Sequence, residues 1–402
     1  MAAHKRTVLS VFTGAGGLDL GLEAANFCVI GCIESDENAR CTIATNRGAL
    51  WPLLGRDIAS SIERITPRRL GIARKALSIL AGGPPCQPFS KAAQWSRTAT
   101  GMRDRRSRCL NSFFRLAELF LPQVILLENV PEFIAGNRTA RRVVTDALRR
   151  INKRNGTHYK LQWQIVNAAD YGVPQRRRRA ILIAPRDGKK FEWPKPTHRD
   201  NPTTAWDAIG SLSDSKRPVA MGKWARLLPS IPEGKNYQWH TAKGKGRNLF
   251  GYRTRYWSFL LKLAKHEPSW TLSAQPGPGT GPFHWENRPL TVKELLKLQT
   301  FASSWKVSGN HRAQVRQIGN ATPPLLGEII GRALGRQVFS ARYPAALKFQ
   351  IRRRRNLPTA DGHKKVPVLF LVQEGMYAPH PGPGRGPKPL IPHTEYAKRK
   401  AA

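Results

Sequence analysis

The sequence predicts an α/β fold built on a mostly parallel sheet, together with a smaller domain of irregular structure. Short apolar runs typical of buried strands alternate with amphipathic segments typical of helices through the first part of the chain. A glycine-rich turn joins the first predicted strand to the first predicted helix, as in the opening unit of a nucleotide-type α/β domain. From residue 185 to about residue 287 this alternation stops, and Pro, Gly, Lys and Trp become frequent instead.

The composition points to a polyanionic partner. The 402-residue chain carries 67 Lys and Arg against 26 Asp and Glu, a formal net charge of +41. Nucleic acid is the first expectation, ahead of an anionic membrane surface, and charge alone does not separate DNA from RNA. No segment has the long apolar run of a transmembrane helix, and the N-terminus lacks the apolar region of a signal peptide.

The cysteines indicate a reducing setting. Five cysteines are an odd number in a chain of this length, which argues against a disulfide framework and favours a cytosolic protein. Cys28 and Cys32 have no second pair of ligands at zinc spacing, so we interpret both as packing residues and expect no metal.

The first unit of the predicted domain consists of a strand, a turn and a helix. Residues 7–12 are apolar and β-rich, the turn is Thr13-Gly14-Ala15-Gly16-Gly17, and residues 18–25 have helical spacing. The strict dinucleotide pattern requires a third glycine where Asp19 stands. A cofactor without a pyrophosphate would not need that glycine.

Two acids follow the first unit. A second strand is predicted at 29–33, and Glu34 comes directly after it, twenty residues beyond Gly14. This offset is typical of an acid that accepts hydrogen bonds from a ribose, and the alternative of a residue beside a helix N-cap is less favoured. Asp57, in Arg56-Asp57-Ile58, fits an ordinary turn when it is considered alone.

A rigid loop presents Cys86. The third predicted strand, 77–80, leads into Ala81-Gly82-Gly83-Pro84-Pro85-Cys86-Gln87-Pro88-Phe89-Ser90. The two prolines end the strand, so Cys86 is held on a stiff loop at a carboxyl end, where ligands bind in open α/β sheets. Most free cysteines are small buried hydrophobes, but a core position needs no such rigid presentation.

A carboxylate ends the next strand. Helix 110–121 and strand 124–127 lead to Glu128, and a polar basic loop at 97–108 is suited to closing over a substrate. A charge at the end of a buried strand loses solvation free energy, so such a residue usually has a function or a charged partner. A salt bridge to one of the many arginines is the structural alternative.

A basic hairpin completes the first domain. After a predicted helix at 141–151, strands 161–167 and 180–183 flank Tyr171-Gly172-Val173-Pro174-Gln175 and the run 176–179. In a hairpin, alternate arginines of the run would point the same way, whereas the structural alternative is a solvated basic face.

The second domain and the tail are less regular. The tryptophans between 185 and 287 fit either nucleic-acid contact or an irregular core, and the two are equally favoured for each residue. Helices are predicted at 289–300 and 325–334. After Tyr343 we count twelve Lys and Arg against three acids, which indicates a mostly flexible basic arm with a short strand at 366–372.

Ordered together, these motifs resemble those of the cytosine-C5 DNA methyltransferases over nearly all of residues 7–335. The matching segments, in family order, are Phe12 to Gly17, Glu34, Asp57-Ile58, Gly83-Pro84-Pro85-Cys86-Gln87, Glu128-Asn129-Val130, Gln175 with Arg177 and Arg179, Arg288-Pro289-Leu290-Thr291 through Gln299, and Gln317-Ile318-Gly319-Asn320-Ala321 with Pro323-Pro324. The tail matches nothing in the family.

The resemblance implies the fold and the domains. It implies a Rossmann-like class I S-adenosylmethionine-dependent methyltransferase fold, a mostly parallel sheet with a terminal antiparallel hairpin strand. The catalytic and cofactor-binding domain would span 1–186, and an irregular target recognition domain would span 187–313. Residues 314–342 would return to the catalytic domain, and 343–402 would form a basic Pro/Gly-rich tail.

The resemblance also implies roles for single residues. Cys86 would add to C6 of a flipped-out cytosine, Glu128 would hold its N3 and amino group, and Arg179 would hold its O2, while Arg177 would order the active-site loop. The cofactor-binding residues would be Phe12, Gly14, Gly16, Gly17, Glu34, Asp57, Ile58, Pro84 and Asn320. The substrate-binding residues would be Pro85, Gln87, Ser90, Asn129, Gln175 and Thr271.

The expected function is therefore methyl transfer from S-adenosylmethionine, without a metal, to cytosine C5 in double-stranded DNA at a specific sequence. An RNA (tRNA) methyltransferase on the same scaffold is the first alternative, and a catalytically silent DNA-binding protein is the second. We expect a monomer in the cytoplasm, associated with the nucleoid and not with a membrane. A cognate restriction endonuclease is a candidate partner.

Overall fold

The computed structural model describes residues 6–56, 65–85, 107–135, 140–213, 217–251, 255–372 and 374–375. Five predicted site residues lie outside these ranges: Asp57, Ile58, Cys86, Gln87 and Ser90. Most of the predicted loop at 97–108 also lies outside them. None of the helices in the described ranges combines the length and the apolar character that a bilayer span requires.

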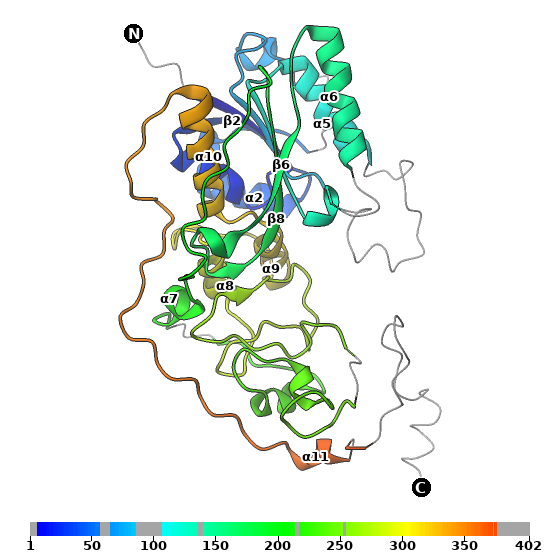
Figure 1. Cartoon of the computed structure of the whole chain (residues 1–402), viewed down its shortest axis with the longest axis vertical. Helices are drawn as coiled ribbons and strands as arrows, with labels where there is room; N and C mark the ends of the chain where they lie inside the picture. Colours follow the sequence, from blue (N-terminus) through cyan, green and yellow to red (C-terminus); the bar gives the residue numbers. More distant parts are fainter. Residues whose placement is uncertain are drawn as a thin grey trace.

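A seven-stranded sheet forms the centre of the catalytic part, and it confirms the predicted mostly parallel α/β fold (Figure 1). Its strands, in spatial order, are β3 (Leu53–Gly55), β2 (Phe27–Ile33), β1 (Arg6–Val11), β4 (Ile79–Gly82), β5 (Val124–Asn129), β8 (Arg178–Pro185) and β6 (Gln162–Asn167). Strand β8 runs antiparallel to both of its neighbours, and the other pairs are parallel. The predicted antiparallel hairpin is therefore β6 with β8.

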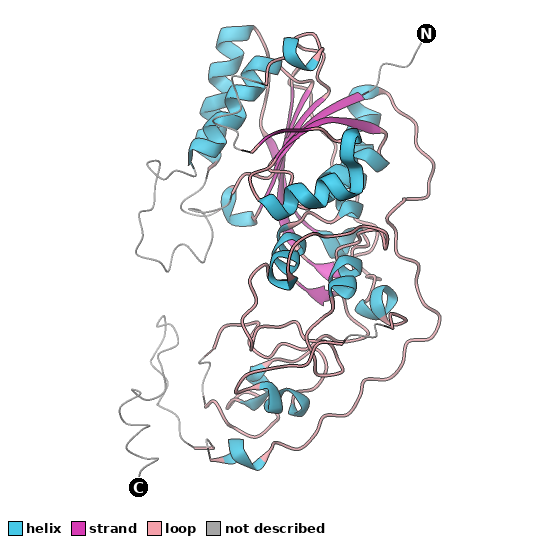
Figure 2. Ribbon diagram, turned by 180° about the vertical axis from the view of Figure 1, so that it is seen from behind, coloured by secondary structure: helices cyan, strands magenta, loops and turns pink. Residues whose placement is uncertain are grey.

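Helices cover both faces of this sheet (Figures 1 and 2). They are α1 (Gly17–Ala24), α2 (Glu37–Arg47), α5 (Ser107–Phe120), α6 (Arg141–Asn155) and α10 (Pro324–Phe339). Side chains alternate between the faces along a strand, so Val8 packs in the core that includes α1 and α10, whereas Leu9 packs in the core that includes α5 and α6. Helices α1 and α10 can cross closely because Gly21 has no side chain. A Cβ on Gly21 would lie 2.4 Å from the Gly327 carbonyl carbon.

The second part of the chain has little regular structure, as predicted. It holds α7 (Ala205–Ile209), β9 (Ser269–Trp270), α8 (Val292–Leu298) and α9 (His311–Asn320), and the short strand β7 (Gln175–Arg176) pairs with β9. Short 3-10 helices lie at Gly48–Leu50, Arg68–Leu70, Pro131–Phe133, Ala168–Tyr171, Ala225–Ser230 and Tyr237–His240. A third core forms here from residues that include Leu227, Tyr237 and Phe250.

The tryptophans of this region serve mainly in packing. Trp285 is buried in the first core, and Trp224 packs between Phe250 and Phe259 at centroid distances of 5.4 and 5.7 Å. Trp257 differs, with 44% of its surface exposed. The structure therefore favours the core interpretation for Trp224 and Trp285 and leaves Trp257 available for contact.

Three details of the sequence-based predictions are wrong. Cys32 is buried, but Cys28 on the same strand is exposed, so only one of the two is a packing residue. Residues 366–372 contain a helix, α11 (Val368–Leu371), instead of a strand. Residues 343–372 are not a free arm, because they pack along both parts of the molecule.

Candidate active site

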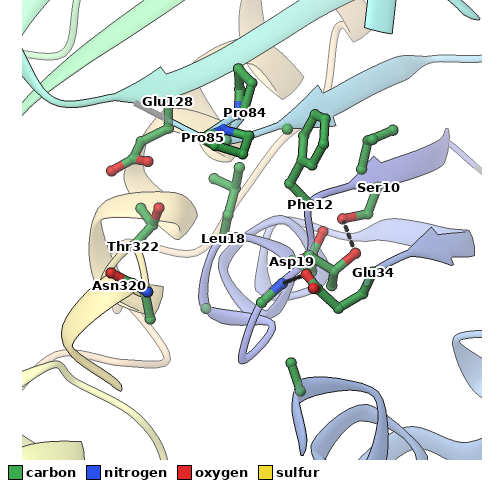
Figure 3. Close-up of a pocket in the computed structure, with 18 of the residues that line it drawn as sticks. Ser10, Phe12, Leu18, Asp19, Glu34, Pro84, Pro85, Glu128, Asn320 and Thr322 are labelled. Atoms are coloured by element: carbon green, nitrogen blue, oxygen red, sulfur yellow. Dashed lines mark hydrogen bonds between the residues drawn. The ribbon is translucent and has the colours of Figure 1, made fainter. Parts of the chain in front are cut away.

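A cavity of about 440 Å³ opens where β1, β2, β4 and β5 end at their carboxyl edge. The junction between α9 and α10 closes its other side (Figure 3). Figure 3 shows Glu128, Pro84 and Pro85 at one end of this cavity and Glu34, Asp19 and Ser10 at the other, with Phe12 and Leu18 between them. The topology of the sheet thus brings motifs that are distant in sequence to one site.

Glu34 is held firmly at one end of the cavity. Its carboxylate accepts a hydrogen bond from the Gly14 backbone N at 2.7 Å and another from the Asp36 backbone N at 2.7 Å. These bonds connect the glycine turn after β1 to the end of β2. The carboxylate oxygens keep lone pairs toward the cavity, which suits the predicted contact with ribose hydroxyls.

Phe12 carries backbone strain at this end of the cavity. Its φ is +59°, a left-handed conformation that a bulky residue rarely adopts, and its backbone N donates to the Ile33 carbonyl at 2.8 Å. The conformation aims the phenyl ring into the cavity instead of continuing the strand (Figure 3). The ring provides an apolar surface of the kind a nucleobase stacks on.

The turn after β1 also contacts the segment between α9 and α10. A Cβ on Gly17 would lie 2.1 Å from the Thr322 carbonyl oxygen, so only glycine allows the two backbones to approach this closely. Asn320 and Thr322 therefore line the cavity (Figure 3), and the glycine turn lies against them. The sequence indicated Asn320 but not Thr322.

Asp19 is a buried carboxyl group that the sequence did not mark as a site residue. Only 1% of its surface is exposed, and its Oδ1 has no hydrogen-bond partner among the described residues. Burial raises the pKa of this carboxyl to about 6, and the nearby carboxylates of Glu23 and Glu34 add to the shift, whereas a hydrogen bond with Ser10 opposes it. The position of the missing third glycine therefore holds a titratable group beside the cavity.

The other end of the cavity joins β4 to β5. Asn129 Nδ2 donates to the Pro84 carbonyl oxygen at 2.8 Å, which fixes the loop after β4 against the end of β5. A Cβ placed on Gly83 would be 3.4 Å from Glu128 Oε2. The carboxylate of Glu128 thus lies against the backbone that leads into Cys86, and the exposed Pro85 is the last described residue before that cysteine.

Glu128 forms an ion pair with Arg179. The distance from Arg179 Nε to Glu128 Oε1 is 2.9 Å, and the two side chains are 12% and 9% exposed. The Arg179 guanidinium compensates the negative charge of Glu128 in this poorly solvated site. The structural alternative considered for Glu128, a salt bridge, is therefore present, and the pair lines the cavity.

Arg177 is fully buried behind this pair. Its Nη2 donates to the Gly319 carbonyl oxygen at 2.8 Å, whereas its Nε and Nη1 have no hydrogen-bond partner in the described part of the chain. Burial lowers the pKa of the Arg177 guanidinium well below its usual value, and the charge of Arg179 acts in the same direction while Glu128 opposes it. Arg179 thus lines the cavity, whereas Arg177 contacts the segment that carries Asn320, and the joint role of the two arginines stays a prediction.

Gln175 has a different environment from the one expected of a substrate contact. Its side chain is fully buried, its Nε2 donates to Gln299 Oε1 at 3.1 Å, and its Oε1 accepts from the Leu272 backbone N at 3.2 Å. It leaves no surface for a substrate, so the prediction of a direct contact is corrected to a structural role. Thr271, by contrast, is exposed, and its hydroxyl donates to the Arg176 carbonyl at 2.7 Å.

No group of three or more His, Cys, Asp or Glu side chains in the described ranges is arranged to bind a metal ion. The donors at the cavity are instead carboxylates, backbone groups and guanidinium groups, the set that binds a polar organic molecule. The geometry supports chemistry at a carboxylate-guanidinium pair that lines the cavity.

Comparison with known proteins identifies the family. The family model described as C-5 cytosine-specific DNA methylase matches residues 6–336. The Type II methyltransferase M.SacI from Streptomyces achromogenes is 33% identical over 402 aligned residues, which cover 91% of this chain and 100% of that protein. The Type II methyltransferase M.Eco47II from Escherichia coli is 32% identical over 351 residues, covering 82% of this chain and 78% of that protein.

Solved structures share the fold at lower identity. The Entamoeba histolytica methyltransferase EhMeth superimposes with a TM-score of 0.56 at 16% identity, covering 83% of this chain and 98% of that one. The S. pombe Dnmt2 methyltransferase gives a TM-score of 0.51 at 17% identity, covering 82% and 98%. The chain therefore belongs to the C-5 cytosine-specific DNA methylase family and is a DNA (cytosine-5) methyltransferase.

Proposed function

We propose that this methyltransferase transfers a methyl group from S-adenosylmethionine to C5 of a flipped-out cytosine at a specific sequence in duplex DNA. The observation that carries the proposal is the Glu128–Arg179 ion pair of 2.9 Å, which lines the same cavity as the backbone leading into Cys86. An acid, a cation and a neighbouring nucleophile are the groups that covalent activation of a pyrimidine requires.

The residues at the other end of the cavity fit S-adenosylmethionine. Glu34 would accept hydrogen bonds from the ribose hydroxyls, Phe12 would stack near the adenine, and the Gly14 to Gly17 turn with Asn320 would lie near the methionine part. Because the cofactor has no phosphates, the third glycine is not needed at the Asp19 position. Asp57 and Ile58, which would hold the adenine, lie outside the described residues.

The bound cofactor would supply an electrophilic methyl group. The Cys86 thiolate would add to C6 of the cytosine, and the electron density would pass to C5, making that carbon nucleophilic. Glu128 would donate a hydrogen bond from a shared proton to N3, and Arg179 would hold O2 as charge develops on the ring. After methylation, loss of the C5 proton would let Cys86 leave and restore the aromatic ring.

A base in a stacked duplex cannot reach this cavity. The cavity lies at the carboxyl edge of the sheet, between the ends of β4 and β5 and the junction of α9 and α10, so the target nucleotide would have to rotate out of the helix. Thr271, with its exposed hydroxyl, would contact the DNA backbone, and Asn129 would support the loop through its bond to Pro84. The positive charge of the chain would contribute sequence-independent affinity.

The relatives suggest the biological setting. M.SacI and M.Eco47II are named Type II methyltransferases, so we propose that this enzyme protects a sequence cut by a cognate restriction endonuclease. It would act as a monomer in the cytoplasm, associated with the nucleoid. Bisulfite sequencing of DNA from cells that express the protein would identify the methylated sequence.

The proposal is tested by transfer of labelled methyl groups from S-adenosylmethionine to duplex DNA and, in parallel, to tRNA. We expect labelling of DNA, and labelling of tRNA alone would overturn the proposal. The Cys86→Ser variant should lose both turnover and the covalent complex with DNA that contains 5-fluorocytosine. Cys41→Ser is the matched control, because Cys41 is an exposed free thiol and should be replaceable without effect.

A further inference from the structure

The C-terminal part of the described chain forms a long strap across the molecule. The described residues 341–367 contain no helix or strand, and they run from the end of α10 along the edge of both parts to α11 (Figures 1 and 2). We call residues 343–372 the strap. We call residues 217–251 and 255–261, which supply most of the third core, the distal lobe.

The strap begins with a buried anchor on α10. The Glu328 carboxylate, fully buried, accepts hydrogen bonds from the Lys348 backbone N at 2.9 Å and the Phe349 backbone N at 3.1 Å. Arg332 donates to the Pro344 and Ala346 carbonyls at 2.6 and 2.7 Å and pairs with Glu328 at 2.7 Å. The buried charges of Glu328 and Arg332 form hydrogen bonds with the backbone of the strap, and these bonds fix this end of the strap to the catalytic part.

The middle of the strap follows α7. The Arg354 backbone N donates to Asp207 Oδ1 at 2.8 Å, and Trp206 Nε1 donates to the Asn356 carbonyl at 2.9 Å. The strap contributes backbone groups to these two contacts, and the Arg354 side chain adds hydrogen bonds to the Asp207 carbonyl at 3.3 Å and to Ser211 Oγ. The arginine-rich run therefore has its main chain bound while Arg355 remains exposed.

The far end of the strap is bound to the distal lobe by a polar cluster in which Lys265 and Glu233 are buried and Asp361 is exposed. Lys265 Nζ lies 2.9 Å from Glu233 Oε1 and 2.8 Å from Asp361 Oδ2, and the Asp361 backbone N donates to Glu233 Oε1 at 2.9 Å. The Lys364 backbone N donates to the Pro229 carbonyl at 2.9 Å. Glu233 and Pro229 belong to the distal lobe, so the strap reaches past the first core.

Phe370 completes the core of the distal lobe. It is fully buried, and its ring is stacked on Trp224 at a centroid distance of 5.7 Å and an angle of 13°. The other buried members of that core come from residues 227–283. A side chain separated from them by almost ninety residues of chain thus fills the centre of the lobe, where its removal would leave a cavity.

We propose that the strap positions the distal lobe relative to the catalytic cavity, and that Phe370 is the positioning residue at its far end. Domains joined by irregular segments move relative to each other unless something restrains them. A chain bound at α10, at α7 and inside the distal lobe removes that freedom before DNA binds. The inference rests on the proposed function, because it assumes that the distal lobe contacts the DNA whose cytosine enters the cavity.

The proposal predicts an effect on DNA recognition rather than on chemistry. Phe370→Ala should raise KM for duplex DNA at least tenfold and reduce discrimination against altered target sites, because a displaced lobe no longer presents its contacts together. The value of kcat at saturating DNA and the affinity for S-adenosylmethionine should change less than twofold. Phe370→Leu should restore most of the loss, and Leu369→Ala, at an exposed neighbour on α11, is the control.

Cleavage of the strap tests whether an unbroken strap is needed for DNA recognition. The protein folds before it is cut, so a failure to fold cannot explain the result. A protease recognition sequence inserted between Leu357 and Pro358, both exposed, allows the same preparation to be assayed before and after cutting. We expect KM for DNA to rise only after cleavage. An unchanged KM and unchanged site discrimination after complete cleavage, or a Phe370→Ala effect confined to kcat, would overturn the proposal. An uncut protein that does not methylate duplex DNA would instead contradict the proposed function.

Discussion

At the scale of the residue, the charge on Glu128 is the feature most directly coupled to the proposed chemistry. Glu128→Gln keeps the shape of the side chain but removes the negative charge opposite Arg179 and the shared proton. We expect the single-turnover rate of methyl transfer to fall at least about 100-fold, the usual contribution of a positioned acid or base. Cofactor affinity should be almost unchanged, because Glu34, the proposed ribose contact, lies at the other end of the cavity.

Rapid-quench assays and a cofactor titration measure these two effects. Glu118→Gln is the matched control, since Glu118 forms a surface pair with Arg154 on the far side of α5. A Glu128→Gln enzyme that retains its rate within a few-fold would exclude the assigned role.

Asp19 predicts a pH dependence of folding stability. Its folded-state pKa of about 6 lies above its ordinary value of 3.8, so between these values the folded state keeps a proton that the unfolded chain has lost. Stability is therefore present at low pH and is lost as the pH rises through about 6, by about 3 kcal/mol in total. Asp19→Asn abolishes this titration.

Urea unfolding of both proteins between pH 4 and pH 8 measures the difference. We expect Asp19→Asn to gain about 2 to 3 kcal/mol of stability relative to the natural protein between pH 4 and pH 8, because only the natural protein loses stability over this range. Because the comparison is between two pH values, any constant effect of the asparagine cancels. An identical difference at both pH values would mean that Asp19 does not titrate in this range.

At the scale of the element, a buried hydroxyl connects α2 to the segment that carries Asn320. Thr42 Oγ1 lies 2.7 Å from Gln317 Oε1 and accepts from the Ser308 backbone N at 2.9 Å. Thr42→Val keeps the volume but leaves these polar groups without the hydroxyl. We expect a loss of about 1 to 3 kcal/mol in the free energy of unfolding and weaker S-adenosylmethionine binding, because α9 forms one wall of the cavity.

Thr45→Val provides the control for that change, because Thr45 is an exposed threonine of the same helix. Equilibrium unfolding and calorimetric cofactor binding of the two variants give the comparison. Equal effects of both substitutions would show that the hydroxyl contacts of Thr42 do not matter.

The elements also show which features could be predicted from the sequence. Strands β1, β2, β4 and β5 were predictable because each is a short apolar run, and the acids and glycines at their ends follow from the chemistry of a parallel sheet edge. The burial of Gln175 was not predictable, since its partners Gln299 and Leu272 are distant in sequence. The helix α11 was mistaken for a strand because four apolar residues have no diagnostic period.

At the scale of the whole molecule, the basic composition correctly predicts nucleic acid as the partner. It does not predict that the strap, residues 343–372, is ordered. Basic, Pro-rich sequence after Tyr343 is typical of disorder, yet the strap is held by backbone hydrogen bonds, by the side chains of Arg354 and Asp361, and by two buried phenylalanines, Phe349 and Phe370. Backbone contacts leave no pattern in the side chains of the strap. Its buried partners include Glu328, Asp207 and Glu233, each in another part of the chain.

Because residues 343–372 have a structural role, the electrostatic role of the tail should be tested on the residues that follow the strap. Deletion after Tyr343 would remove Phe349 and Phe370 from two cores, whereas deletion of residues 376–402 removes five Lys and Arg and one Glu and leaves the strap intact. Each lost phosphate contact reduces the dependence of log Kd on log salt concentration by about 0.9. We expect the slope to decrease by up to about 4, with the methylated sequence unchanged in bisulfite sequencing. A neutral Gly/Ser segment of the same length should behave like the deletion; a full slope with that segment, or a changed target sequence, would contradict a purely electrostatic role.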